Sequence, residues 1–415
     1  MTNDDATMLI VGAGLAGAKA AETLRAEGFP GRVVLIGDEH ERPYERPPLS
    51  KEYLQSRADR ASVFVHPPDW YDEHGVELRT GVHAAGIDRD AHEVVLADGH
   101  RLGYSKLLLA TGSSPRRLQV PGTELDGVHY LRTLADSDRI AAALRTSSRT
   151  VIVGAGWIGL EVAAAARIAH VAVTVLESAA MPLLVLGPEM AQIFADLHRD
   201  HGVDLRCGAG LAEIIGRDGA VTGVRLSDGT VIDTDTVVIG IGVTPNSALA
   251  EAAGLEVDDG VVVDDRLRSS DLDVHAVGDV ANLWHPALER HLRVEHWANA
   301  LNGGPAAARA MLGAGPTYDR LPYFFTDQDD LGMEYTGHAA PGGYDEVVVR
   351  GDTSTREFVA FWLADGRVRA GMNVNVWDVT DAIAGLIRSA DSVDPARLAD
   401  PAIPLSEVGA GSSAR

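Results

Sequence analysis

A glycine-rich turn between a buried strand and a helix occurs twice in this chain, and this repeat limits the possible fold more than any other feature. In the first copy the apolar segment Met8–Val11 leads into the turn 12–17 (Gly-Ala-Gly-Leu-Ala-Gly) and a small-residue helix, and the strand Val33–Ile36 follows. The second copy begins about 140 residues later, with the strand Thr150–Val153 and the turn 154–159 (Gly-Ala-Gly-Trp-Ile-Gly). Two complete strand–turn–helix–strand units predict an α/β protein with two Rossmann-like dinucleotide-binding domains.

Each turn predicts a set of nucleotide contacts. In such a unit the first glycine permits the tight turn, the second lets the backbone approach a pyrophosphate, and the third lets the helix pack against the strand. The phosphates then lie at the positive N-terminus of the helix. We therefore predict contacts from Gly12, Gly14, Ala16 and Gly17 in the first turn, and from Gly154, Gly156, Trp157, Ile158 and Gly159 in the second.

An acidic residue follows the second strand of each unit. Asp38 lies 21 positions after Gly17, and Glu177 lies 18 positions after Gly159. Both are placed to bind the hydroxyl groups of an adenosine ribose. A 2′-phosphate facing Glu177 would meet like charge, and residues 178–180 supply no Arg or Lys, so we expect NADH rather than NADPH. The alternative is that Glu177 is only a solvated loop carboxylate.

Two nucleotide sites in one chain predict a resident FAD and a visiting nicotinamide. Hydride transfer between them needs stacking and orientation rather than a protein acid or base. The 15 histidines show no metal-ligand spacing, so we predict no metal site.

Further glycine-ended segments complete the predicted domain plan. Ala110-Thr111-Gly112 ends an apolar strand of the first half, Gly242 ends one of the second, and Gly278-Asp279 forms a third landmark. The strands expected over 346–349 and 358–363 and the helix over 378–388 indicate a separate C-terminal α+β domain. We predict an FAD-binding domain from 1–113 and 243–320, an NAD-binding domain from 114–242, an α+β domain from 321–405 and a disordered tail from 406–415.

The charge balance excludes some classes of partner. The chain has 36 basic and 60 acidic residues, a formal net charge of −24, and a field of that sign repels nucleic acids and anionic membranes. No apolar run approaches the ~18 residues of a membrane-spanning helix, and Met1–Thr7 lacks the features of a signal peptide. We expect a cytoplasmic protein that binds neither nucleic acid nor membrane.

The segment Pro43–Lys51 (Pro-Tyr-Glu-Arg-Pro-Pro-Leu-Ser-Lys) resembles the flavin-contacting segment of the FAD-dependent, NADH-linked ferredoxin reductases that serve cytochrome P450 and oxygenase systems. The family also has a branch similar to apoptosis-inducing factor, and the resemblance extends from about Met8 to Leu405. It implies a glutathione-reductase-like flavoprotein fold and electron transfer from NADH through FAD to an iron–sulfur ferredoxin of the [2Fe-2S] type.

The resemblance also implies roles for single residues. It places one set of residues around FAD: Asp38, Arg46, Lys51, Val82, Ala110, Thr111, Gly112, Arg132, Gly278, Asp279 and Trp297. It pairs Lys51 with Glu161 beside the flavin, where a positive charge would stabilise the reduced ring, and we assign the catalytic role to this pair. The alternative for Glu161 is an exposed residue in the first turn of a helix. Trp157 is predicted to gate the nicotinamide pocket; the alternative is a core residue.

The single cysteine separates this chain from related enzymes. Disulfide reductases need two nearby cysteines, and NADH peroxidases need one near Ser50. Cys207 instead lies in a predicted strand, where we interpret it as a packing residue. Electrons therefore leave the flavin directly, and an iron–sulfur protein is the natural acceptor. Phe325, where relatives often have Trp, keeps two alternatives open: an oxidoreductase with a quinone, radical or oxygen acceptor, and an NADH-sensing flavoprotein.

Overall fold

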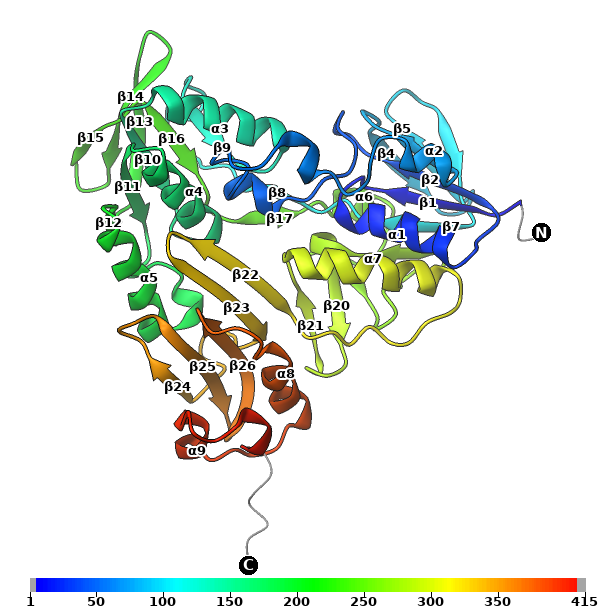
Figure 1. Ribbon diagram of the computed structural model, residues 1–415. Helices are drawn as coiled ribbons and strands as arrows, with labels where there is room; N and C mark the ends of the chain where they lie inside the picture. Colours follow the sequence, from blue (N-terminus) through cyan, green and yellow to red (C-terminus); the bar gives the residue numbers. More distant parts are fainter. Residues whose placement is uncertain (1–4, 409–415) are drawn as a thin grey trace, which may run out of the picture. The chain divides into compact units, whose positions relative to one another are not determined.

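The computed structural model describes residues 5–408, whose strands and helices are drawn in Figure 1. The chain forms two compact units and crosses between them several times. Unit 1 consists of Met1–Arg46, Arg60–Ser114 and Val243–Pro322, and unit 2 of Pro47–Asp59, Pro115–Gly242 and Tyr323–Arg415. No helix within residues 5–408 is both long and apolar enough to cross a membrane.

Unit 1 is built on a five-stranded parallel sheet with the strand order β19-β7-β1-β2-β3. Its strands are β1 (Thr7–Val11), β2 (Arg32–Ile36), β3 (Val76–Arg79), β7 (Lys106–Leu109) and β19 (Val274–Ala276). The last four residues of β1 are buried, as expected for a central strand that is covered on both faces. The sheet therefore places the end of β1 and the first glycine turn deep in the unit.

Helices α1 (Leu15–Ala26) and α7 (Trp297–Met311) pack closely against each other in unit 1. A Cβ at Gly304 of α7 would overlap the carbonyl oxygen of Ala16 on α1, so only glycine permits this approach. The smaller elements of the unit are α2 (Trp70–Glu73), α6 (Ala248–Ala252), the antiparallel sheet of β4 (Ala84–Asp88), β5 (Glu93–Leu96) and β6 (Arg101–Gly103), and the sheet of β18 (Val261–Val263), β20 (Ala281–His285) and β21 (Arg290–Arg293). The pair β8 (Ser113–Pro115) and β17 (Val243–Pro245) contains residues at which the chain leaves and re-enters unit 1.

Unit 2 repeats the parallel arrangement with the strand order β12-β11-β10-β16-β9. The strands are β9 (Val128–Tyr130), β10 (Arg149–Val153), β11 (Ala172–Glu177), β12 (Asp204–Cys207) and β16 (Thr236–Ile239), and the helices are α3 (Leu134–Thr146), α4 (Trp157–Ile168) and α5 (Pro188–Asp200). An antiparallel sheet of β13 (Leu211–Arg217), β14 (Ala220–Leu226) and β15 (Val231–Asp233) completes this part.

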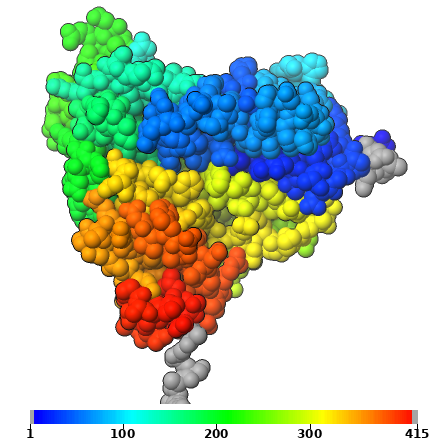
Figure 2. Space-filling model, in the orientation of Figure 1, coloured from blue at the N-terminus to red at the C-terminus, as the bar shows by residue number. Residues whose placement is uncertain are grey.

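The second sheet of unit 2 is antiparallel, with the order β22-β23-β26-β25-β24. It consists of β22 (Tyr323–Gln328), β23 (Leu331–Gly337), β24 (Glu346–Asp352), β25 (Glu357–Ala364) and β26 (Arg367–Val374), followed by α8 (Thr380–Ser389) and α9 (Pro395–Ala399). One apolar core joins this sheet to α4 and α5, and the Trp362 indole donates a hydrogen bond to the carbonyl of Leu186. In Figure 2 the red C-terminal residues lie against the orange strands of the same unit.

The predicted strands and helices are all present, including the C-terminal helix. The predicted division into FAD, NAD and C-terminal domains is not the division into compact units, because Pro47–Asp59 groups with unit 2 and the C-terminal α+β region belongs to the same unit. As a division by function it stays a prediction. The 3₁₀ turn Leu405–Glu407 extends into the predicted tail, and Val408 of that tail is buried. Residues 409–415 of that tail lie outside the described residues.

Candidate functional site

The first glycine turn is tight, and its glycines have different surroundings. Gly12 has a φ of +121°, and a Cβ there would overlap the carbonyl group of Ala110. A Cβ at Gly17 would overlap the carbonyl oxygen of Gly12, so α1 starts directly against the turn. At Gly14, in contrast, a Cβ would meet no atom within 4 Å. This open side leaves room for a group that approaches the backbone, as a pyrophosphate does.

The second glycine turn has the same construction. Gly154 has a φ of +102°, and a Cβ there would overlap the carbonyl oxygen of Gly240. A Cβ at Gly159 would overlap the carbonyl oxygen of Gly154, whereas a Cβ at Gly156 would meet nothing within 4 Å. The two units therefore carry two equivalent cradles, each open at its second glycine.

Both cradles fit a dinucleotide diphosphate. The N-caps of α1 and α4 are Gly14 and Gly156; neither cap makes a side-chain hydrogen bond, and neither helix has an acidic residue in its first turn. The first backbone N–H groups and the positive end of each helix dipole are therefore available to an anion. This donor set suits a diphosphate, and the single phosphate contacts predicted for FAD and NAD(H) stay predictions.

Glu177 is fixed beside the second cradle. Its carboxylate accepts hydrogen bonds of 2.8 Å from the backbone N–H groups of Ala155 and Ala179. The first of these donors lies within the glycine turn itself. Glu177 is therefore a fixed group of the cradle rather than a freely solvated loop carboxylate.

Asp38 is not the equivalent of Glu177. Val11 pairs with Ile36 in unit 1 as Val153 pairs with Leu176 in unit 2, so Gly37 takes the place of Glu177. A Cβ at Gly37 would lie 2.5 Å from the Cβ of Ala13, which explains why this position is glycine. Asp38, one residue further along, is exposed. Its predicted ribose contact stays a prediction.

A pocket of about 480 Å³ follows the second cradle along the ends of the parallel strands. It is lined by residues of the turn, by Glu177 and Ser178, and by Gly242 at the end of the predicted glycine-ended strand. None of its lining residues is Lys or Arg. Its electrostatic character therefore suits two ribose hydroxyls better than a 2′-phosphate.

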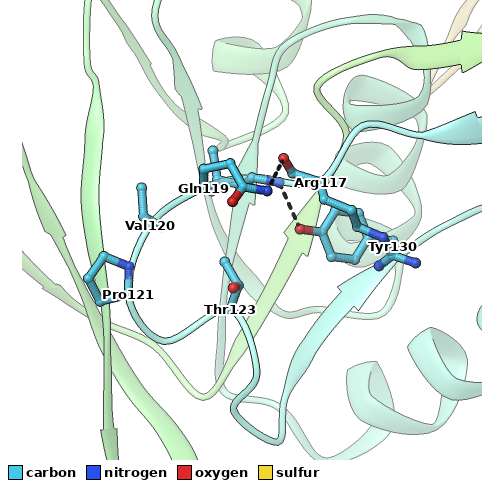
Figure 3. Close-up of a pocket in the computed structure, with 7 residues that line it drawn as sticks. Arg117, Gln119, Val120, Pro121, Thr123 and Tyr130 are labelled. Atoms are coloured by element: carbon cyan, nitrogen blue, oxygen red, sulfur yellow. Dashed lines mark hydrogen bonds between the residues drawn. The ribbon is translucent and has the colours of Figure 1, made fainter.

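A second pocket, of about 530 Å³, shares Leu118 with the nucleotide pocket (Figure 3). The guanidinium group of Arg117 lies 4.3 Å from the centroid of the Tyr130 ring, and the Tyr130 hydroxyl accepts a hydrogen bond from the backbone of Leu118. Arg117, Gln119 and Pro121 are exposed, so this pocket is shallow. It extends the nucleotide cleft and has no catalytic group of its own.

The predicted FAD residues of unit 1 are held by side chains that sequence reasoning missed. Arg46 forms a 2.9 Å ion pair with Glu39, which also accepts a hydrogen bond from the Tyr44 hydroxyl. Asp279 accepts a 2.7 Å hydrogen bond from Ser113. Glu39 directly follows Asp38, so its position after β2 was the only available signal.

The remaining predicted contacts of unit 1 lie near the strand ends. Val82 packs against the apolar core and donates its N–H to the carbonyl of Gly37. Thr111 donates a 2.9 Å hydrogen bond to the carbonyl of Asn246, and the Trp297 indole donates a 3.2 Å hydrogen bond to Glu45. These contacts fix the side chains; their roles toward FAD stay predictions, as do those of Gly112 and Gly278.

Lys51 and Glu161 form a buried ion pair within unit 2. The 3₁₀ turn Pro47–Ser50 brings Lys51 to α4, where its Nζ lies 2.7 Å from Glu161 Oε1. The Ser50 hydroxyl donates a 2.5 Å hydrogen bond to Glu161 Oε2. Glu161 is only 4% exposed, so the alternative of an exposed helix residue is wrong. Thr326 of β22 also donates to Glu161 Oε1, at 2.6 Å, a contact that sequence reasoning missed.

One aromatic ring lies near this ion pair, and others pack together in the same unit. The Phe325 ring lies 5.3 Å from Lys51 Nζ. Trp157 packs against Phe324 and Phe194 with centroid distances of 4.8 and 5.7 Å, so its side chain joins the aromatic core of unit 2. Its predicted gating role stays a prediction.

Two further predicted residues of unit 2 are Ile158, at the start of α4, and Arg132, before α3. Ile158, the second residue of α4, is 44% exposed and open to a ligand. The backbone N–H of Arg132 donates a 3.1 Å hydrogen bond to Asp136, just before α3. Neither contact tests a role toward a nucleotide, and both roles stay predictions.

Cys207 lies at the end of β12, paired in register with Glu177 of β11. It packs against the apolar core, and burial raises the pKa of its thiol. No second cysteine exists in the chain. Within residues 5–408, no group of three His, Cys, Asp or Glu side chains is arranged to hold a metal ion.

Comparisons with known proteins agree with these two cradles. Residues 6–304 match the family described as pyridine nucleotide-disulphide oxidoreductase, and residues 323–409 match the reductase C-terminal family. These matches define a flavoprotein reductase. The chain belongs to the pyridine nucleotide-disulphide oxidoreductase family.

Several members of this family are similar over nearly the whole chain. Rhodocoxin reductase of Rhodococcus erythropolis is 40% identical, over 89% of this chain and 86% of the relative. Putidaredoxin reductase CamA of Pseudomonas putida is 38% identical, over 99% of both. The structure also matches the reductase in the crystal structure of the covalent putidaredoxin reductase–putidaredoxin complex, with a TM-score of 0.95 and 37% identity, over 99% of this chain and 100% of that one. The comparisons confirm the predicted family, the α/β fold, the oxidoreductase class and the cofactors FAD and NAD(H).

Proposed function

We propose that this chain is an NADH:ferredoxin oxidoreductase. It binds FAD at the first cradle and NADH at the second, and it passes single electrons to an iron–sulfur ferredoxin that serves a P450 or Rieske-type oxygenase. The observation that carries the proposal is the presence of two glycine cradles in one chain, both open at the second glycine and free of acidic groups at the helix start. One cradle would serve a resident cofactor and the other a visiting one.

The ferredoxin acceptor is supported by the relatives and by the chemistry of the chain. The similar proteins are named as reductases of rhodocoxin and putidaredoxin, and the matched crystal structure is a complex with putidaredoxin. A disulfide relay is unavailable to this chain, because Cys207 is the single cysteine and its thiol is partly buried. Electrons that enter by hydride transfer must leave without a protein thiol.

The protein's own residues bind and orient the reactants. FAD, when bound, supplies the acceptor for hydride and the donor of single electrons. The glycine turns hold the diphosphates, and Glu177 fixes the adenosine ribose of NADH. Lys51, held by Glu161 at 2.7 Å, is the fixed positive charge that the family resemblance assigns to stabilising the reduced ring. No side chain has to move a proton for the hydride step.

We infer a preference for NADH over NADPH from the same pocket. Glu177 is held by two backbone N–H groups, and the pocket is lined by no basic side chain. A 2′-phosphate would meet an uncompensated negative charge there. The functional division of the chain into FAD, NAD and C-terminal domains, the cytoplasmic location and the lack of nucleic-acid and membrane partners stay predictions from the sequence.

The proposal is tested by NADH-driven reduction of cytochrome c with the purified flavoprotein, with and without an added [2Fe-2S] ferredoxin. We expect a large, saturable increase when ferredoxin is present. The matched control is Gly156→Ala, which keeps the FAD cradle intact but obstructs the NADH cradle. Rapid bleaching of the wild-type flavin by NADH with no ferredoxin effect would contradict the acceptor assignment and favour a quinone, a radical or oxygen.

A further inference from the structure

A chain of buried hydrogen bonds leads away from the Lys51–Glu161 pair into the core of unit 2. Thr326 Oγ1 lies 2.6 Å from Glu161 Oε1, Gln328 Nε2 lies 3.1 Å from Thr326 Oγ1, and His198 Nε2 lies 2.8 Å from Gln328 Oε1. Thr326, Gln328 and His198 are at most 1% exposed. Burying three polar side chains in an apolar core is costly unless each finds a partner, and here each partner is the next member of the chain.

The fold sets up this chain through strand alternation. Thr326 and Gln328 are two residues apart on the edge strand β22, so their side chains point to the same face. That face meets α4, which carries Glu161, and α5, which carries His198. Phe325, the residue before Thr326, is out of phase with both and points to the other face. Its ring lies 5.3 Å from Lys51 Nζ.

The direction of every hydrogen bond follows from the carboxylate end. A carboxylate paired with an ammonium group accepts hydrogen bonds and donates none, so the Thr326 hydroxyl uses its one proton toward Glu161. Its lone pair then accepts from the Gln328 amide. The Gln328 carbonyl is left facing His198, so His198 Nε2 carries a proton.

His198 fits this assignment as a neutral imidazole. Burial lowers the pKa of His198, which favours the uncharged form. With the proton on Nε2, Nδ1 is bare, and this buried atom has no hydrogen-bond partner within residues 5–408. His198 therefore donates its Nε2 proton to the Gln328 carbonyl. This fixes which group donates and which accepts in each of the three hydrogen bonds.

We propose that Thr326, Gln328 and His198 are positioning residues for the Lys51–Glu161 pair, a one-directional relay whose donors all point toward the Glu161 carboxylate. The relay holds the carboxylate in one orientation, and thereby fixes Lys51. This inference rests on the proposed function, because it takes the Lys51–Glu161 pair to lie close to the flavin.

The relay predicts an effect on the reduction potential of the flavin. Thr326→Val removes this donor at nearly constant volume, so the Glu161 carboxylate loses one of its three hydrogen bonds and is held less firmly against Lys51. The charge of Lys51 is then less closely balanced, although Asp327 also acts on it, and a less balanced positive charge favours reduction of a neighbouring group. We expect the midpoint potential to move upward in Thr326→Val and to return to the wild-type value in Thr326→Ser.

The experiment is stepwise chemical reduction of the FAD-loaded variants, with the midpoint potential of the flavin as the readout. Thr336→Val is the matched control, since Thr336 is buried on the adjacent strand β23 and its hydroxyl has no partner within residues 5–408. We expect the upward shift in Thr326→Val, a smaller upward shift in Gln328→Leu, and no shift in the control. Equal potentials in Thr326→Val and wild type, or equal shifts in Thr326→Val and Thr326→Ser, would overturn the relay.

These measurements need no ferredoxin, so the two proposals can fail separately. A wild-type enzyme that ignores ferredoxin but shows the Thr326→Val shift would overturn the acceptor assignment and keep the relay. If the wild-type enzyme reduces ferredoxin but the flavin potential of Thr326→Val is unchanged, the acceptor assignment is kept and the relay is overturned.

Discussion

The ammonium group of Lys51 and the carboxylate of Glu161 form a buried 2.7 Å ion pair, although 110 residues separate them in the sequence. The pair ties the turn after Pro47 to helix α4 within unit 2. Three hydrogen bonds converge on the carboxylate, from Lys51, Ser50 and Thr326. The proposed role of Lys51 requires this pair to be fixed.

Replacing one residue of the Lys51–Glu161 pair should lower the free energy of unfolding more than replacing both residues. Lys51→Met leaves Glu161 buried without its cation, and we expect the free energy of unfolding to fall by about 3 kcal/mol. Lys51→Met/Glu161→Gln should recover part of this loss. Urea unfolding of the two variants measures the difference. At the half-exposed Lys19–Glu22 pair, Lys19→Met should cost less than about 1 kcal/mol. An equal loss in the single and double variants would contradict the coupling.

The two cradles can be tested independently by alanine substitutions. Gly14→Ala and Gly156→Ala both fit the fold, because a Cβ meets no atom within 4 Å at either position, but each methyl group fills space meant for a diphosphate. Gly14→Ala should lower the affinity for FAD, and Gly156→Ala should raise KM for NADH with unchanged FAD content. Flavin absorbance and steady-state kinetics distinguish these outcomes. Loss of FAD in Gly156→Ala would show that the assignment is wrong.

Cofactor choice should depend on Glu177. In Glu177→Ala/Ser178→Arg the carboxylate is gone and a cation is present, so we expect kcat/KM to rise for NADPH and to fall for NADH. Single charge-assisted contacts of this kind are worth ~1.5–3 kcal/mol, or about 10- to 100-fold. Ser178→Ala is the control for the change at position 178. If the ratio of the two kcat/KM values is unchanged, the assignment of Glu177 as a ribose contact is wrong.

Cys207 should be dispensable and slow to react. Burial raises the pKa of its thiol, so the reactive thiolate is scarce at neutral pH and becomes more abundant as pH rises. Alkylation by iodoacetamide should therefore be slow near pH 7 and accelerate in alkaline buffer. Cys207→Ala should retain full NADH-driven ferredoxin reduction. A large loss of turnover in this variant, with FAD fully bound, would point to a thiol step.

Acid sensitivity should be traceable in part to His275. Burial, with a smaller effect of Lys106, lowers the pKa of His275 from 6.5 to about 4. Between these values the unfolded chain binds a proton that the folded protein excludes, so stability is present above pH 6.5 and is lost as pH falls toward 4. His275 alone should lower the free energy of unfolding by about 3 kcal/mol over this pH range. In urea unfolding, His275→Leu should lose less stability than wild type over this range; parallel curves would contradict the assignment.

Local features of the fold were predictable from the sequence. The glycine turns and their flanking strands are encoded within about 30 residues, as such units are. The ion pair of Lys51 with Glu161 came only from the family resemblance, since no spacing rule joins residues 110 positions apart.

Contacts that depend on three-dimensional packing were missed. Thr326, Gln328 and His198 gave no signal, because strand alternation becomes informative only when the helices covering that face are known. The two acidic ribose candidates appeared equivalent by residue count. Strand register shows that they are not equivalent, because Gly37 and not Asp38 matches Glu177. The segment between α1 and β2 is two residues longer than the segment between α4 and β11, which accounts for the offset.

The most direct test of the central claim is an anaerobic single-turnover experiment. The FAD-loaded enzyme is first reduced with an equivalent amount of NADH and then mixed with excess oxidised [2Fe-2S] ferredoxin, while flavin and cluster absorbance are followed together. We predict fast flavin reduction, followed by flavin reoxidation with two ferredoxins reduced per flavin, since hydride carries two electrons and each cluster accepts one. A flavin that NADH reduces quickly but that stays reduced in the presence of ferredoxin would contradict the account.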